Sequence, residues 1–112
     1  MTHNIDLPPP PSTNHLYAHH GSRRHKSSQY KRWLKDVGYF LNLAPSLDGK
    51  PYKVKILANV DRKRDIDNLV KPILDAMVRS QVVPDVRWCD YVEVERSLVP
   101  DKNMVRVTWE KF

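Results

Sequence analysis

Apolar and polar residues alternate over residues 52–60, where every second position from Tyr52 to Val60 is apolar. Lys53 and Lys55 occupy positions between them. A period of two places successive side chains on opposite faces of a strand. The pattern therefore predicts a strand with one buried face and one face in solvent.

A helical period follows Ser27 and Ser28, which are both suitable N-cap residues. The apolar stripe of this segment consists of Tyr30, Trp33, Leu34, Val37, Phe40 and Leu41. Pro45 and a turn-forming segment at residues 48–51 end the element. We expect an amphipathic helix that buries the whole stripe.

A second helical stripe covers about residues 68–80. Its buried side is formed by Leu69, Val70, Ile73, Leu74 and Met77. Pro72 has no amide hydrogen, so the helix either begins close to this residue or bends at it.

The C-terminal third of the chain predicts an irregular segment at residues 82–88 and then two strands, at residues 91–99 and 104–109. Residues 100–103 are expected to join the two strands as a short hairpin turn. The order of the elements predicts an α+β (mixed α/β) fold. We expect one small domain over residues 1–112, with a mixed β-sheet of about four strands packed against two main helices.

The N-terminal segment is different in character. Residues 7–12 contain four consecutive prolines, which favour an extended chain close to polyproline II. Residues 14–26 are polar and predict a loop, with room for a short strand around residues 15–18. We therefore expect an extended proline-rich arm and loop over residues 1–26.

The charge balance points to a polyanionic partner. Nineteen Lys and Arg against thirteen Asp and Glu give a formal net charge of +6, which favours nucleic acid but is also found in small basic proteins of other kinds. Cys89 is the only cysteine, which excludes an intramolecular disulfide and a cysteine-rich zinc site. We expect a cytoplasmic protein with no secretory signal and no membrane-spanning segment.

Two carboxylates lie just beyond the predicted strand. Asp65 and Asp67 are two positions apart, so in an extended segment both face one side while Ile66 faces the other. A hard cation such as Mg²⁺ would relieve their repulsion. Lys71 follows four positions after Asp67, on the same side of a helix. Helix capping would select the same acidic residues, so both interpretations stay open.

Asp75, four positions further on, is expected to pair with Lys71 or Arg79.

The segment Asp-Ile-Asp-Asn-Leu-Val-Lys-Pro-Ile-Leu-Asp-Ala-Met at residues 65–77 closely resembles the central motif of the RusA family of Holliday-junction resolvases. Residues 7–14 with Tyr17 are similar to the opening segment of that family, and residues 28–33 are similar to the start of its first helix. A Val-Val pair at residues 82–83, an acidic loop and a Val-x-Val strand follow in the expected order.

This resemblance implies a homodimeric, Mg²⁺-dependent endodeoxyribonuclease that cuts four-way DNA junctions in a bacterial or phage-infected cell. Mn²⁺ is expected to substitute, and no organic cofactor is implied. By match to the motif, Asp65 and Asp67 are carried over as metal ligands and Lys71 as the residue that faces the phosphate.

The resemblance also implies a third metal ligand, for which this chain offers two candidates. The family usually shows two adjacent acids after the Val-Val pair, whereas this chain has Asp85 and then Asp90. Asp85 has the better spacing and Asp90 is the reserve.

Two basic stretches are candidates for phosphate contacts, which would supply affinity without sequence readout. They comprise Arg23, Arg24, Lys26, Lys31, Arg32 and Lys35, and then Arg62, Lys63 and Arg64. Two other functions stay open: a DNA-binding protein without nuclease activity, and a metal-dependent nuclease that acts on other branched substrates.

Overall fold

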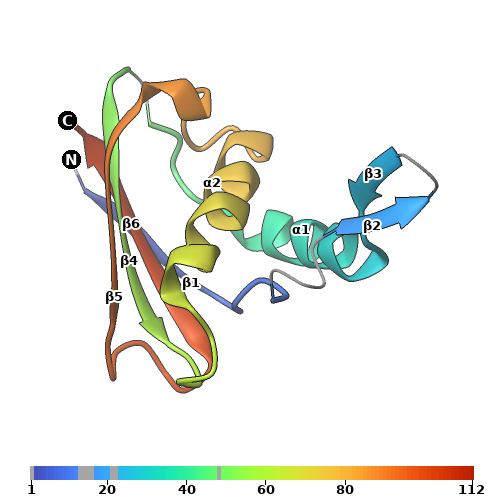
Figure 1. The fold of residues 1–112 in the computed structure, drawn as a ribbon. Helices are drawn as coiled ribbons and strands as arrows, with labels where there is room; N and C mark the ends of the chain where they lie inside the picture. The colour runs from blue at the N-terminus through green and yellow to red at the C-terminus, as the bar shows by residue number, and fades with distance from the viewer. Residues whose placement is uncertain (1, 13–16, 21–22, 48) are drawn as a thin grey trace.

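A computed structural model describes residues 2–12, 17–20, 23–47 and 49–112 of the chain (Figure 1). Its regular elements are β1 (His3–Leu7), β2 (Tyr17–His20), β3 (Arg23–Lys26), α1 (Ser28–Leu41), β4 (Tyr52–Asn59), α2 (Val70–Arg79), β5 (Cys89–Arg96) and β6 (Met104–Lys111). Two short 3₁₀ turns, η2 (Ile66–Leu69) and η3 (Val86–Trp88), flank α2. The prediction of an α+β fold with a four-stranded mixed sheet and two main helices is confirmed.

The main sheet has the strand order β1-β6-β4-β5. The β4–β5 pair is parallel, whereas β6 is antiparallel to both β1 and β4. Parallel neighbours need a crossover, which η2 and α2 provide. Both α1 and α2 lie on one side of the sheet (Figure 1). Because β4 and β5 run in the same direction, the segments that follow them leave from the same end of the sheet.

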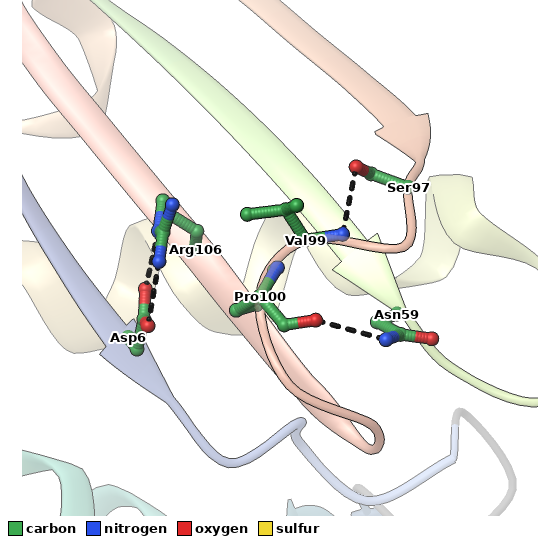
Figure 2. A network of polar contacts seen from close by, with 6 residues as sticks. All are labelled: Asp6, Asn59, Ser97, Val99, Pro100 and Arg106. Atoms are coloured by element: carbon green, nitrogen blue, oxygen red, sulfur yellow. Dashed lines mark hydrogen bonds and ion pairs between the residues drawn. The ribbon is translucent and has the colours of Figure 1, made fainter.

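The prediction of a hairpin turn at residues 100–103 is wrong, because β4 lies between β5 and β6. The connection instead passes across the end of β4 and is fastened there. The Asn59 side-chain amide donates to the carbonyl oxygen of Pro100 at 2.8 Å, and the Val99 amide donates to the Ser97 hydroxyl at 3.1 Å (Figure 2).

The core lies between the helices and the sheet. Tyr52, Val54, Ile56 and Ala58 of β4 are all buried, which confirms the predicted alternation. The predicted stripe of α1 is also buried, except that Phe40 is 50% exposed. At 100° per residue, Phe40 points about 75° from the centre of the five buried positions of the stripe. It therefore lies at the edge of the buried face.

The ends of the two helices agree with the local sequence. Ser27 is the N-cap of α1, and its hydroxyl oxygen accepts a hydrogen bond from the Tyr30 amide at 3.1 Å. Pro72 is the third residue of α2. Its missing amide hydrogen is not needed in the first turn of a helix, so the helix begins close to Pro72 and does not bend there.

The N-terminal segment does not extend away from the domain over its whole length, as an arm would, because its first residues join the main sheet. Residues 3–7 form β1, an edge strand of the main sheet. The Arg106 guanidinium fastens this strand through two hydrogen bonds to the Asp6 carboxylate, at 2.7 and 3.0 Å (Figure 2). Beyond β1, the Trp33 indole donates to the Pro8 carbonyl at 3.0 Å, so the start of the proline run is fastened to α1.

The prediction of a loop over residues 14–26 is also only partly right, since β2 and β3 pair as an antiparallel two-stranded sheet. Of the short strand predicted around residues 15–18, only Tyr17 and Ala18 lie within the described residues, where they begin β2. The β2–β3 pair projects beyond α1, on the side away from the main sheet (Figure 1). Among the residues that the structure describes, no helix has the length and apolar character required to cross a membrane.

Candidate functional site

The two central carboxylates follow β4 at the end of the sheet where β5 also ends. Asp65 occupies the N-cap position of η2 in an extended conformation, and Asp67 lies in the first turn of η2. Both residues are exposed. The Asp65 side chain makes no capping hydrogen bond, and α2 begins without a side-chain cap. Capping by hydrogen bond therefore does not account for Asp65.

Neither carboxylate is neutralised by a neighbouring cation. Within the part of the chain that the structure describes, Asp65, Asp67 and Lys71 form no ion pair. Like-charged carboxylates two positions apart repel each other unless a cation lies between them. The arrangement therefore leaves Asp65 and Asp67 free to bind a cation, and leaves the Lys71 ammonium free to bind an anion.

A groove runs along α2 from Asp67 towards η3. It has a volume of about 510 Å³ and is lined by Asp67, Val70, Lys71, Leu74, Asp75 and Val86. Asp67 and Lys71, which are four positions apart, were predicted to lie on the same side of a helix, and both line this groove. Asp67 and Lys71 thus border the same space, together with the apolar residues Val70, Leu74 and Val86.

Asp75 does not pair as predicted. Its carboxylate accepts a hydrogen bond from the Tyr30 hydroxyl at 3.0 Å, and the described side chains include no ion pair between Asp75 and either Lys71 or Arg79. The Tyr30 ring is fully buried, and a buried phenol needs a polar partner for its hydroxyl group. Asp75 supplies that partner and so joins α2 to α1.

Asp85 lies towards the other end of β4. Its carboxylate caps η3 by accepting a hydrogen bond from the Arg87 amide at 3.1 Å. Its carbonyl oxygen lies 3.3 Å from the hydroxyl of Tyr52, the first residue of β4. An eight-residue strand spans about 23 Å between its first and last Cα atoms. Asp65 follows the last residue of that strand, whereas Asp85 lies beside its first.

The reserve ligand, Asp90, is the second residue of β5, beside the start of β4. It therefore lies at the same end of the sheet as Asp85. Among the residues described, no group of three or more His, Cys, Asp or Glu side chains is arranged to hold a metal ion. One chain does not gather Asp65, Asp67 and Asp85, and their roles as ligands stay predictions.

Tyr52 links the start of β4 to the loop that carries Asp85. Its hydroxyl group also lies 3.2 Å from the Pro84 carbonyl. Burial, with smaller contributions from Cys89 and Asp85, raises the pKa of Tyr52 above its ordinary value. Burial also raises the pKa of the Cys89 thiol. Both groups are therefore neutral at neutral pH, and Tyr52 remains a hydrogen-bond donor.

These shifts predict a loss of stability in alkaline solution. The unfolded chain releases the Cys89 and Tyr52 protons near their ordinary pKa values of about 8.5 and 10, before the folded chain does. The free energy of unfolding should be constant below about pH 8 and should fall above it, by up to roughly 1.4 kcal/mol per pH unit for each group. Urea unfolding from pH 7 to 11 measures this. Tyr52→Phe should flatten the fall above pH 10, and an unchanged slope would contradict the assignment.

The basic residues differ in their exposure to solvent and in their contacts. Arg62 and Lys63 are exposed beside Asp65, as are Lys31, Arg32 and Lys35 on α1. Arg64 is only partly exposed, its guanidinium donates to the Pro10 carbonyl, and burial lowers its pKa. Arg64 thus holds the proline segment against the loop.

The other three residues of the first basic stretch lie in β3. The Lys26 ammonium lies 5.9 Å from the centre of the Tyr30 ring. Arg23 and Arg24 lie in β3, and their side chains are outside the described set.

Sequence reasoning missed Arg96, the last residue of β5. It lies on the same side of the sheet as Val94, opposite the buried Ala58 of β4, and its guanidinium donates to backbone carbonyls of the loop that leads to Asp65. The sequence could have indicated this residue, because a charged side chain on the face of a strand that packs towards the core needs a polar partner there. The partner could not be identified from the sequence pattern, because it consists of backbone carbonyl groups, which every residue has.

Comparison with known proteins identifies the family. The family described as endodeoxyribonuclease RusA matches residues 6–109 of this chain. The chain belongs to the RusA family. The match includes β4, β5, both helices and every predicted site residue, together with the end of β1 and most of β6.

Curated RusA proteins from a bacterium and from two phages are similar over most of their length. The crossover junction endodeoxyribonuclease RusA of Escherichia coli K12 is 33% identical over 96 residues, which cover 80% of this chain and 79% of that protein. The protein of the same name from Enterobacteria phage 82 is 32% identical over 98 residues, with coverage of 80% and 79%. That of phage HK97 is 30% identical over 96 residues, with coverage of 82% and 80%.

RusA membership confirms the resemblance found in the sequence and the enzyme class that it implied, an endodeoxyribonuclease. The family match does not itself assign metal ligands.

Proposed function

We propose that this RusA-family chain is a Mg²⁺-dependent endonuclease that resolves four-way DNA junctions in recombination and repair. Bacterial and phage relatives are named crossover junction endodeoxyribonucleases, which favours this substrate and a cytoplasmic setting. The observation that carries the proposal is the pair of exposed carboxylates, Asp65 and Asp67, which have no ion-pair partner among the described residues and lie close to Lys71.

The donor set fits a hard divalent cation. Asp65 and Asp67 offer four carboxylate oxygens in solvent, and Mg²⁺ commonly takes one or two carboxylates together with water and phosphate. Mn²⁺ accepts the same ligands. When bound, the ion would polarise the scissile phosphate and lower the pKa of a coordinated water molecule. Asp85 is our choice for a third ligand and Asp90 the reserve.

Lys71 acts on the substrate side. Its ammonium is exposed in the same groove as Asp67, one helical turn away. A positive group in this position would bind a non-bridging phosphate oxygen and offset the charge that develops on the leaving oxygen.

A homodimer would complete the site. Asp85 and Asp65 lie towards opposite ends of β4, which favours a third carboxylate supplied by Asp85 of a second copy of the chain. A two-fold dimer supplies this reciprocally, since each copy would contribute Asp85 to the other. Two identical sites also match a junction, which has two strands to cut in related positions.

The exposed pair Arg62 and Lys63 is proposed to contact DNA phosphates. The double variant Arg62→Gln/Lys63→Gln should reduce the slope of log affinity against log salt by about 0.9 for each lost contact, so by up to about 1.8. Filter binding of a four-way junction from 50 to 250 mM salt measures the slope. Lys55→Gln is the matched control, because Lys55 pairs with Glu95 on the sheet face away from the helices. An unchanged slope in the double variant would remove this pair from the interface.

The direct test uses purified protein and a labelled four-way junction with a mobile core. We expect paired cuts in Mg²⁺, none in EDTA, and products that DNA ligase can reseal because they carry 5′-phosphate and 3′-hydroxyl ends. Unlabelled junction should compete far better than linear duplex or a flap. Binding without cutting in Mg²⁺ would indicate a DNA-binding protein instead, and equal cutting of flaps would indicate a nuclease of broader selectivity.

A further inference from the structure

The loop between β4 and Asp65 is wrapped around one side chain. The Arg96 Nη1 atom donates to the carbonyl oxygens of Val60 and Asp61, each at 3.2 Å. Its Nη2 atom donates to the carbonyl oxygens of Arg62, at 3.5 Å, and of Arg64. The two terminal nitrogens of a guanidinium carry four N–H groups, so these four carbonyls use all of them.

No other described side chain from outside the loop donates to these carbonyls. Within the loop, the Asp61 carboxylate accepts from the Lys63 amide at 2.7 Å, and the Asp61 carbonyl accepts from the Arg64 amide at 3.0 Å. The Arg64 guanidinium also ties the loop to the proline segment through the Pro10 carbonyl, but this contact does not reach the main sheet. Arg96 is therefore the link between this loop and the sheet. Because it is the last residue of β5, its position is fixed by the pairing of β5 with β4.

The position of the loop decides the position of the acidic pair. Asp65 directly follows Arg64, whose carbonyl is the last that Arg96 holds, and the Asp65 carbonyl then accepts from the Asn68 amide at 3.2 Å to start η2. A flexible loop would have to be ordered each time that a cation binds, which weakens binding. A planar, permanently charged guanidinium can hold several carbonyls at once, whereas an ammonium is a compact point charge.

We propose that Arg96 is a positioning residue for the cation site: it holds the backbone of residues 60–64 so that the Asp65 and Asp67 carboxylates are presented together before the metal arrives. The proposal rests on the function proposed above. It assigns Arg96 no contact with DNA or with the metal.

Three variants test the proposal. Arg96→Met keeps an unbranched side chain but has no hydrogen-bond donor, and Arg96→Lys keeps the positive charge but not the planar guanidinium. Arg106→Met is the matched control, because Arg106 also fastens one segment to another, through Asp6, but faces the other side of the sheet. Thermal unfolding of each variant shows that it is folded, and if Arg96→Met is not, Arg96→Lys carries the test.

The first measurement is amide hydrogen exchange without metal. Exchange over residues 61–67 should be at least about tenfold faster in Arg96→Met than in the wild type, intermediate in Arg96→Lys, and unchanged in Arg106→Met. The second is the dissociation constant for Mn²⁺ alone, followed by electron paramagnetic resonance. It should rise about tenfold or more in Arg96→Met and stay at the wild-type value in Arg106→Met.

Cleavage adds a third measurement. For Arg96→Met, the Mg²⁺ concentration for half-maximal junction cutting should rise, the rate at saturating Mg²⁺ should recover, and junction affinity in EDTA should stay within about twofold of the wild type. Faster exchange with unchanged Mn²⁺ affinity would overturn the proposal, as would wild-type exchange in a folded Arg96→Met. If the wild-type protein binds Mn²⁺ but cuts no junction, the proposed function fails while the exchange and Mn²⁺ results still decide the role of Arg96.

Discussion

Replacement of Asp67 by asparagine should abolish junction cutting in Mg²⁺ while junction binding stays within about twofold of the wild type. Asparagine has nearly the same shape, so the groove beside Lys71 persists, but it removes one of the two negative charges available to the cation. Loss of several kcal/mol of metal-derived stabilisation corresponds to a fall in rate of about a thousandfold or more. Single-turnover cleavage of a labelled junction, with a gel-shift assay in EDTA for affinity, measures both quantities.

Asp61→Asn is the matched control for that experiment. Asp61 is an exposed carboxylate in the same loop, but its oxygen accepts the Lys63 amide hydrogen bond, which an asparagine side chain can also accept. It should cut at close to the wild-type rate. Cleavage retained by Asp67→Asn would remove Asp67 from the mechanism, and equal loss in both variants would indicate a general effect of charge on the loop.

A mixture of two inactive variants should recover activity if each site draws on both copies of the chain. Asp67→Asn and Asp85→Asn should each be inactive alone. In a mixed dimer, the first copy contributes an intact Asp85 to the intact Asp67 of the second, so one site is whole and the other lacks both carboxylates. Such dimers should nick one strand of a junction at a rate well above either variant alone, because one complete site restores the thousandfold lost.

The control mixture combines Asp67→Asn with Asp65→Asn. These two residues lie on the same chain segment, so every site in the mixed dimer has one lesion and no activity should return. Native mass spectrometry verifies that mixed dimers form. Recovery in neither mixture, with mixed dimers present, would show that Asp85 is not supplied by a second copy.

The features of this fold that sequence predicted are those decided within a few residues. The Ser27 cap depends on a hydroxyl and an amide three positions apart. The strand at Tyr52 depends only on alternation, and the start of α2 depends on the missing amide hydrogen of Pro72. The Asp65–Asp67 pair was likewise visible, because two residues and a following helix define it.

The features that sequence did not predict depend on partners far away along the chain. The order of β5 and β6 is set by the insertion of β4 between them, which no local turn signal reports. Phe40 has the same helical spacing as its buried neighbours but lies at the edge of the face that the core covers. The partner of Asp75 is Tyr30, on another helix, and not a cation one turn away. The distance of Asp85 from Asp65 likewise follows from the length and direction of β4.

In the proposed mechanism, Asp65 and Asp67 hold a divalent cation. A crystal of the wild-type protein soaked in Mn²⁺, with data collected at the manganese absorption edge, would show whether they do. We predict one anomalous peak within about 2.5 Å of oxygens from both carboxylates. Carboxylates that point apart, with no peak between them at saturating Mn²⁺, would contradict the assignment of the acidic loop as the catalytic centre.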